Sequence, residues 1–336
     1  MFDCSNYIRQ FHDDDVKLHD DEKQVLRDCR NTNRDRLKSA LEKDKKPAPL
    51  RFQKQGSYAM LTTIQHPDND YDIDDGVVFK KDDLKSERGS DIQALDVRKM
   101  VCSLLKDNRF NKQPEVLTNC VRVYYNNGHH VDIPVYREYQ DGIVTKCEIA
   151  SSSWRESDPK QINNWFQGQL DKKTIEDDKN DPQMRRMIRL LKKFANSRAS
   201  WNLPNGFILT VLVDEVYIGH VERDDECFSR IIDLMHSRLL SNLEVNNPAQ
   251  STEVITKPYP DPKMELLCDK LNWAHDELIV LSENDCTKKK ALKAWANVFN
   301  TPFWDDLIME SGVKSIVSSG GLPTAAVHKS GGGTYG

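Results

Sequence analysis

The segment Asp70-Tyr71-Asp72-Ile73-Asp74-Asp75-Gly76-Val77-Val78-Phe79 constrains the fold more than any other part of the chain. Its apolar end predicts a strand, and two acids separated by one residue stand at the start of that strand. Alternate side chains of a strand share a face, so Asp72 and Asp74 point the same way while Ile73 points into a core. Two parallel carboxylates favour hard divalent cations such as Mg²⁺, although a lone Asp-x-Asp pair also arises by chance in acidic loops.

A third acid, Asp132, lies within a second strand-like segment, His129-His130-Val131-Asp132-Ile133-Pro134-Val135-Tyr136. A carboxylate between apolar residues is costly to bury without a partner, and a metal shared with Asp72 and Asp74 would supply one. The adjacent residues His129 and His130 point to opposite faces of a strand, so both cannot bind one ion. We therefore expect the three acids, without the histidines, to hold the metal.

Upstream of the acidic pair stands Gln55-Gly56-Ser57-Tyr58. A glycine allows the backbone to approach a phosphate closely, and a serine hydroxyl can bind a phosphate oxygen. Gly-Ser is a weak signal by itself. Its value comes from the order of features: a helix, then Gly-Ser, then the acidic pair, then a separate acid on a later strand.

This order resembles the DNA polymerase beta-like nucleotidyltransferase superfamily. Within it, the stretches QGSYAMLTT, DYDIDDGVVF and HHVDIPVY are similar to the bacterial cGAS/DncV-like nucleotidyltransferases, near the dinucleotide-cyclase members. The resemblance implies an α+β fold with a polymerase beta-like nucleotidyltransferase core, a mixed sheet with flanking helices, and a C-terminal helical domain. It implies two lobes with the active site in the cleft between them.

The resemblance also implies a function. It predicts a synthase that joins nucleoside triphosphates into a cyclic di- or trinucleotide second messenger for antiphage (CBASS) signalling. ATP, GTP or other triphosphates would be the substrates, and the cyclic product would act on a separate effector protein. Asp72, Asp74 and Asp132 would be catalytic residues and ligands of two Mg²⁺ ions, with Mn²⁺ as an alternative metal.

Further nucleotide contacts are expected from both halves. Gln55, Gly56, Ser57 and Tyr58 are candidates in the first half. The segment MRRMIRLLKKFANSRASW predicts a helix with a basic face, on which Lys192 best matches the family's triphosphate-binding lysine, with Lys193 as the fallback. In LPNGFILTVLV, Asn205 replaces the family's usual serine. Arg122 is a second phosphate-binding candidate, and a cross-strand ion pair is the alternative.

Element patterns divide the chain into three parts. Apolar spacing predicts helices over 21–41 and 92–105, and strand-forming residues predict strands over 56–63, 77–79, 120–125 and 131–136. Past residue 151, helical spacing dominates, while the apolar run 206–213 is either a buried helix or a buried strand. We expect a nucleotidyltransferase core over 1–160, a helical domain over 161–316 and a flexible tail over 317–336.

Composition restricts the partners and the compartment. The net charge of −5 argues against a surface that coats nucleic acid, so we expect no strong nucleic-acid binding. The eight scattered cysteines include no close pair for a zinc site and fit reduced thiols. No apolar stretch is long enough to span a bilayer. We expect a cytoplasmic monomer without membrane contact.

The tail and three rival functions remain open. The chain ends on Thr334-Tyr335-Gly336, and an extended glycine carboxylate suits conjugation by a ubiquitin-activating-like ancillary protein, as in some systems of this family. A disordered end without function fits equally well. The rivals are a transferase that makes linear oligonucleotides or tails RNA, a catalytically silent nucleotide-binding module, and a purely structural ion site.

Overall fold

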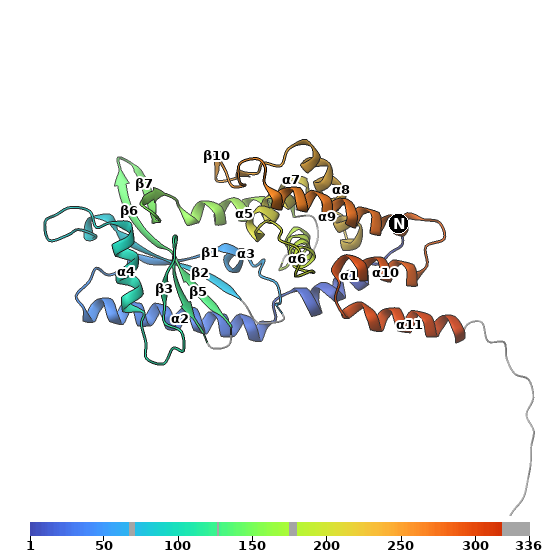
Figure 1. Ribbon diagram of the computed structural model, residues 1–336, viewed down its shortest axis with the longest axis horizontal. Coiled ribbons are helices and arrows are strands. Elements are labelled where there is room, and N and C mark those ends of the chain that lie inside the picture. Colours follow the sequence, from blue (N-terminus) through green and yellow to red (C-terminus); the bar gives the residue numbers. More distant parts are fainter. Residues whose placement is uncertain (67–70, 126–127, 175–179, 318–336) are drawn as a thin grey trace, which may run out of the picture.

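The computed structural model describes residues 1–66, 71–125, 128–174 and 180–317. Two halves lie side by side along the long axis of the molecule, a sheet with flanking helices and a bundle of helices (Figure 1). This α+β architecture is the expected one.

Eight strands within the described residues form one mixed sheet in the order β3-β4-β5-β2-β6-β7-β8, with β1 paired to β2. Their bounds are β1 Arg51–Gln55, β2 Asp72–Lys80, β3 Glu115–Val116, β4 Val121–Tyr124, β5 His130–Ile133, β6 Val135–Asp141, β7 Val144–Ala150 and β8 Trp154–Glu156. The expected strand over 131–136 is thus two strands that meet at Pro134. Both strands run parallel to β2 and keep the same register. They are separated because proline has no backbone N–H to donate and so interrupts the hydrogen-bond ladder at that residue.

Two long helices cover one face of this sheet (Figure 1). They are α2 Asp20–Lys43 and α4 Ala94–Leu104. The buried cluster on this face contains Leu37 and Leu41 of α2 and Val97 and Val101 of α4. It also contains the alternate apolar residues of β2, Val77 and Phe79. This packing leaves the other face of β2, which carries Asp72 and Asp74, turned toward the helical half.

The remaining helices belong mainly to the second half. They are α1 Ser5–Phe11, the π-helix η1 His12–Val16, α3 Gly56–Met60, η2 Lys81–Asp83, α5 Pro159–Lys173, α6 Gln183–Ala195, α7 Gly206–Val216, α8 Asp224–Ser241, α9 Pro262–Leu278, η3 Ile279–Ser282, α10 Lys288–Phe299 and α11 Phe303–Val317. A short hairpin, β9 Asn246–Asn247 with β10 Gln250–Val254, joins α8 to α9. The predominantly helical character expected past residue 151 is confirmed.

The first residues of the chain pack in the helical half. Cys4, Ile8, Phe11 and Val16 are all buried in the same core as α6 to α10. Phe11 contacts the rings of Phe299 and Trp304, with ring centroids 4.7 and 5.0 Å away. The part expected as a separate first domain, residues 1–160, therefore lends its first helices to the core of the second half.

Two local expectations are resolved by the structure. The prediction of a strand over 56–63 is wrong, because Gly56–Met60 forms the short helix α3. Gly56 has a φ of 65°, a left-handed conformation that glycine adopts without a steric penalty, and it turns the chain sharply out of β1. The apolar run 206–213 is a buried helix, α7, whose first backbone amides are capped by the side chain of Asn205.

Candidate active site

The acidic residues lie in a row that crosses the sheet. Asp74 of β2 stands directly opposite Asp132 of β5 and opposite Gln55 of β1, while Arg122 of β4 stands opposite Asp132. Asp72 lies two residues before Asp74 and is on the same face. The parallel pairing of β2 with β5 thus brings the three acids expected from the sequence onto adjacent positions of one face.

Arg122 neutralises part of this row. Its Nε and Nη2 atoms donate to the two carboxylate oxygens of Asp132 at 2.7 and 2.8 Å, and Nη2 lies 3.4 Å from Asp72. A guanidinium matches a carboxylate in this two-point geometry. Of the two alternatives that the sequence left open for Arg122, the structure shows the cross-strand ion pair.

Asp74, by contrast, has a carboxylate that makes no hydrogen bond or ion pair with the described residues. Burial, followed by the negative charges of Asp132 and Asp72, raises its pKa to about 7. A partly buried carboxylate that lacks a counter-charge, beside two further acids, fits a divalent cation. The donor set therefore suits Mg²⁺, with Asp74 as the central ligand.

The three carboxylates are not gathered around one point. Among the described residues, one group of three potential ligands has all its ligand atoms within 4.8 Å, and it is His12, Asp13 and Asp181. That group is already paired, since Arg189 donates to Asp181 at 2.8 Å and His12 lies 2.7 Å from Asp13. Asp132 faces Arg122, so a metal shared by all three catalytic candidates requires Asp132 to turn from this partner.

The turn from β1 into α3 lies against Asp74. A Cβ on Gly56 would stand 2.0 Å from Oδ2 of Asp74, so a glycine is needed at this position. Ser57 shares a hydrogen bond with the hydroxyl of Thr63 at 3.1 Å, and the hydroxyl of Tyr136 donates to Gln55 at 2.9 Å. These contacts fix the Gly-Ser turn beside the acids.

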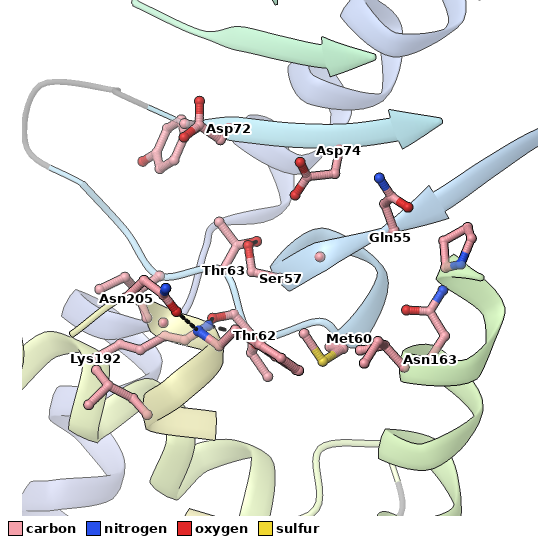
Figure 2. A pocket seen from close by; sticks show the side chains of 18 of the residues that line it. Gln55, Ser57, Met60, Thr62, Thr63, Asp72, Asp74, Asn163, Lys192 and Asn205 are labelled. Carbon is pink, nitrogen blue, oxygen red and sulfur yellow. Dashed lines mark hydrogen bonds between the residues drawn. The ribbon is translucent and has the colours of Figure 1, made fainter. Parts of the chain in front are cut away.

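A cavity of about 770 Å³ separates this turn and the acids from the helical half. Figure 2 shows Asp72 and Asp74 along β2 on one side, with Lys192 and Asn205 on the other and Ser57 between them. Helix α7 begins at this wall with its Phe207 and Ile208 amides bonded to the Asn205 side chain, and the positive end of its dipole favours an anion. The volume is in the upper part of the range for small-molecule sites, roughly 300–1,000 Å³.

Helix α6 holds the end of α3 through three cations on one face. Arg185 donates to the carbonyl of Met60 at 3.1 Å, Arg189 to that of Leu61 at 3.0 Å, and Lys192 to that of Thr62 at 3.1 Å. These side chains recur at spacings of four and three, so they share a face of the helix. The last carbonyl of α3 and the two carbonyls that follow it thus find their hydrogen-bond donors on a helix far away in the sequence.

Lys192 is the member of this set that reaches the cavity. It is 8% exposed and has no acidic partner among the described residues; its ammonium group contacts the carbonyl and hydroxyl of Thr62. Burial and the neighbouring Arg189 lower its pKa to about 7. An anion in the cavity would restore the charged form of this lysine.

Most of the predicted site residues line the cavity. Gln55, Gly56, Ser57, Asp72, Asp74, Lys192 and Asn205 do so. Three do not: Arg122 and Asp132 form their ion pair at the edge, and Tyr58 lies 5.8 Å from Arg30 beside a different cavity. Lys193 is bound to Asp15, with 2.9 Å to its carbonyl. Gly336 lies outside the described residues.

Several lining residues were missed from the sequence. Thr62, Thr63, Tyr136 and Asn163 all face the cavity. None of them stands in a pattern that distinguishes it from an ordinary core or surface residue. In the structure, Tyr136 packs so closely on Gly76 that a Cβ there would lie 2.8 Å from its ring, a contact between two strands that the sequence does not reveal.

The sequence matches a known family over residues 50–136, the span from β1 to β6. The family is described as "Cyclic GMP-AMP synthase DncV-like, nucleotidyltransferase domain". A curated relative from Escherichia albertii, a cyclic GMP-AMP synthase, is 28% identical over 301 residues, which cover 87% of this chain. The matched region spans 62% of the length of that relative.

Solved structures share the fold across both halves. Escherichia coli DncV in its 3'-deoxy GTP-bound form has a TM-score of 0.67 and 17% identity, with 88% of this chain and 94% of that chain covered. CdnC of E. coli MS115-1 with ATP has a TM-score of 0.67, 16% identity, and 89% and 98% coverage. Apo DncV of Vibrio cholerae has a TM-score of 0.67, 19% identity, and 85% and 91% coverage. Residues 50–136 therefore match a DncV-like nucleotidyltransferase domain, and the chain shares the fold of these solved structures across both halves.

Proposed function

We propose that this protein joins nucleoside triphosphates into a cyclic di- or trinucleotide by metal-dependent phosphoryl transfer. One observation carries the proposal: the carboxylate of Asp74, which has no bonded partner among the described residues, faces a cavity whose opposite wall holds the buried Lys192 and the start of α7. An acidic wall and a cationic wall across one cavity suit a triphosphate that binds together with divalent cations.

Asp72, Asp74 and Asp132 would hold two Mg²⁺ ions. When bound, these ions supply neutralisation of the phosphate charge and activation of the attacking hydroxyl. Asp74 would lose its proton as the site forms, because the cations would offset the burial and the charges of Asp132 and Asp72 that raise its pKa to about 7. Asp132 contributes by exchanging its contact with Arg122 for the site, because its carboxylate stands directly opposite Asp74 in the sheet register.

The phosphate chain would lie between the two walls. Ser57 offers its hydroxyl, and Gly56 allows close approach because it has no side chain. On the other side, Lys192 supplies a positive charge and α7 supplies the positive end of its dipole. These groups orient the α-phosphate toward the acids, so that the hydroxyl of a second nucleotide can attack it and pyrophosphate can leave.

The cavity also supports ring closure. It is wide enough to keep a linear intermediate in place for a second round of the same reaction. Among the relatives of the same fold, V. cholerae DncV has been solved with the linear intermediate 5' pppA(3',5')pG. A dinucleotide held in this way brings its own hydroxyl and triphosphate together, which favours a cyclic product over chain growth.

Incubation of the purified protein with radiolabelled ATP, GTP, CTP and UTP, in all pairs and with or without Mg²⁺, tests the proposal. We expect a Mg²⁺-dependent product that alkaline phosphatase does not alter, because a ring has no terminal phosphate. A product that phosphatase shortens indicates a linear oligonucleotide synthase. Tight nucleotide binding without any product, in every pair, would indicate a silent binding module.

We extend the proposal to the biological role that the resemblance implies. The cyclic product would activate a separate effector in antiphage defence, and Gly336 would be the site at which an ancillary protein conjugates the chain. Mass spectrometry of the chain isolated from its native cells, before and during infection, tests whether Gly336 is conjugated. A carboxyl terminus that is always free, during infection as well as before it, would exclude conjugation.

A further inference from the structure

The first residue of α7, Gly206, lies against the stem of Lys192. A Cβ atom on Gly206 would stand 2.9 Å from Cε of Lys192 and 3.3 Å from its Nζ. Cβ atoms essentially never have neighbours closer than 3.0 Å, so an alanine at this position would displace the lysine. Lys192 therefore occupies the space that a side chain on residue 206 would need.

The backbone at Gly206 does not explain the glycine. Gly206 belongs to the helix α7, whose conformation residues with side chains adopt more readily than glycine does. Gly168 of α5 offers a comparison, because a Cβ there would meet nothing within 4 Å. The close neighbour that distinguishes Gly206 is Lys192, so contact with this lysine is the physical reason for a glycine at the start of α7.

Thr62 holds the other end of the lysine. The ammonium group donates to the carbonyl and to the hydroxyl of Thr62 at 3.1 and 3.0 Å, and only 8% of Lys192 is exposed. Lys192 thus lies between Thr62 and the first turn of α7. An added Cβ at position 206 would press on the flexible end of this side chain, which can move without disturbing the fold around it.

The place of the lysine over α7 brings two positive groups together. The N-terminus of a helix carries the positive end of its dipole, so it repels an adjacent ammonium group until an anion binds to both. Gly206, Lys192 and Asn205 line the same cavity, and Figure 2 shows Lys192 and Asn205 at one wall of it. One phosphate group at this wall can therefore meet the lysine and the helix N-terminus at once.

We propose that Gly206 is a positioning residue for the phosphate contact. Because it has no side chain, the stem of Lys192 can cross the first turn of α7, and the ammonium group and the helix N-terminus then act on one phosphate group. This inference rests on the function proposed above, since it concerns the triphosphate-binding wall of the same cavity. Gly206 acts through Lys192, so its effect should vanish when the lysine is removed.

A double-mutant cycle tests this dependence. Isothermal titration of the full chain with inorganic tripolyphosphate and Mg²⁺ measures the binding that depends on Lys192. We expect Gly206→Ala to weaken this binding roughly tenfold or more, the scale of a lost charge-assisted contact. In a Lys192→Ala background the same change should have little effect, because the stem that it displaces is absent. Gly168→Ala is the matched control in an open part of a helix, and should bind like the wild type.

Proton uptake gives a second measurement, which a purely structural role of Gly206 would not change. Burial and the charge of Arg189 lower the pKa of Lys192 to about 7, and a bound phosphate favours the charged form. At pH 8 the uptake on binding should therefore be smaller in Gly206→Ala than in the wild type. In Gly168→Ala it should be unchanged.

The outcomes separate this inference from the proposed function. Wild-type affinity and proton uptake in Gly206→Ala would overturn the inference and leave the function standing. Equal losses from Gly206→Ala in the two backgrounds would also overturn it, because the alanine would then disturb α7 itself. If Lys192→Ala binds tripolyphosphate as tightly as the wild type, the phosphate contact of the proposed function fails, and Gly206 has no contact to position.

Discussion

A Cβ atom on Gly56 would lie 2.0 Å from the Oδ2 atom of Asp74. The turn that follows β1 and the carboxylate of Asp74 in β2 are therefore in direct contact, with no room for a side chain between them. Gly56 also needs its left-handed φ of 65°. The Gly-Ser turn and the acidic pair, which are separate motifs in the sequence, are one unit in the structure.

Gly56→Ala should disable the site through this contact. The alanine Cβ pushes the carboxylate of Asp74 aside, and a displacement of about 1 Å at a reacting centre can reduce the rate on the order of 10²-fold. The left-handed backbone adds a cost of about 1–2 kcal/mol for any residue with a side chain. Turnover of radiolabelled triphosphates and thermal unfolding measure the two effects.

Gly142→Ala is the matched control for the backbone cost. Gly142 has a φ of 62° in the turn between β6 and β7, and a Cβ there would meet nothing within 4 Å. The Gly142 variant should therefore lose the backbone cost alone and the Gly56 variant at least as much, whereas activity should fall in the Gly56 variant alone. Comparable activity in the two variants would show that Asp74 can move without consequence.

Asp74→Asn should stabilise the metal-free protein while it abolishes synthesis. The carboxyl pKa rises from 3.8 in a model peptide to about 7 in the folded chain. Stability associated with the protonated form is complete below the lower value and is lost as pH rises through the higher one. The shift corresponds to on the order of 4 kcal/mol at most, so the Asn variant should melt higher at pH 8 and similarly to the wild type below pH 4.

Thermal melts from pH 4 to pH 8, in chelator and then in excess Mg²⁺, check this prediction. Mg²⁺ should remove most of the difference between the two proteins, because the cation stabilises the ionised carboxylate of the wild type alone. A wild type that is insensitive to Mg²⁺ at pH 8 would contradict the metal assignment. A melting difference that does not change with pH would contradict the raised pKa.

The sequence predicted the parts of the site that depend on strand geometry. Period-two alternation placed Asp72 and Asp74 on one face, and strand position placed His129 and His130 on opposite faces. The structure has His129 against Glu22 at 3.0 Å and His130 on the side of Asp72, at 3.6 Å. Which face of a strand a side chain occupies depends only on its position along that strand, so these features can be predicted from neighbouring residues.

Features that depend on distant contacts could not be predicted. Residues 56–60 read as a strand, but their helix is held by α6 cations at positions 185, 189 and 192, more than 120 residues later. The first residues were assigned to the first half as part of 1–160, although Phe11 packs among the rings of α10 and α11. Periodicity reports which face of an element is apolar and does not report which core receives it.

Lys192→Met should weaken triphosphate binding about 10- to 100-fold, the usual range for a lost charge-assisted contact. Burial and the charge of Arg189 lower the pKa of Lys192 to about 7 in the free protein, so a substantial fraction of the molecules lacks the charge at neutral pH. A bound triphosphate favours the charged form. Binding above pH 7 should therefore take up a proton and should weaken as pH rises.

Calorimetry at pH 8 in buffers of different ionisation enthalpy measures the proton uptake, which should disappear in the Met variant. Lys193→Met is the control, because Lys193 bonds to the carbonyl of Asp15 at 2.9 Å and does not line the cavity. If Lys193→Met weakens binding and Lys192→Met does not, the neighbouring lysine is the phosphate ligand.

Arg122→Gln should increase the affinity for Mg²⁺ several-fold. The guanidinium holds Asp132 at 2.7 Å and lies 3.4 Å from Asp72, so it competes with any cation for both carboxylates. Removing the positive charge strengthens the attraction of the acidic row for a divalent ion and frees Asp132 to reach it. Without Mg²⁺ the same variant should unfold at a lower temperature, because Asp132 is then buried without a partner.

Arg34→Gln is the matched control for Arg122→Gln. Arg34 makes an equivalent ion pair with Asp75, at 2.6 Å, but on the face of β2 that packs against α2. Both variants should lose stability in chelator, and Mg²⁺ should restore it in the Arg122 variant alone. The opposite result would be that Arg122→Gln raises the Mg²⁺ concentration needed for half-maximal stabilisation. The arginine would then hold Asp132 in the orientation that binds the metal, instead of competing with the metal for it.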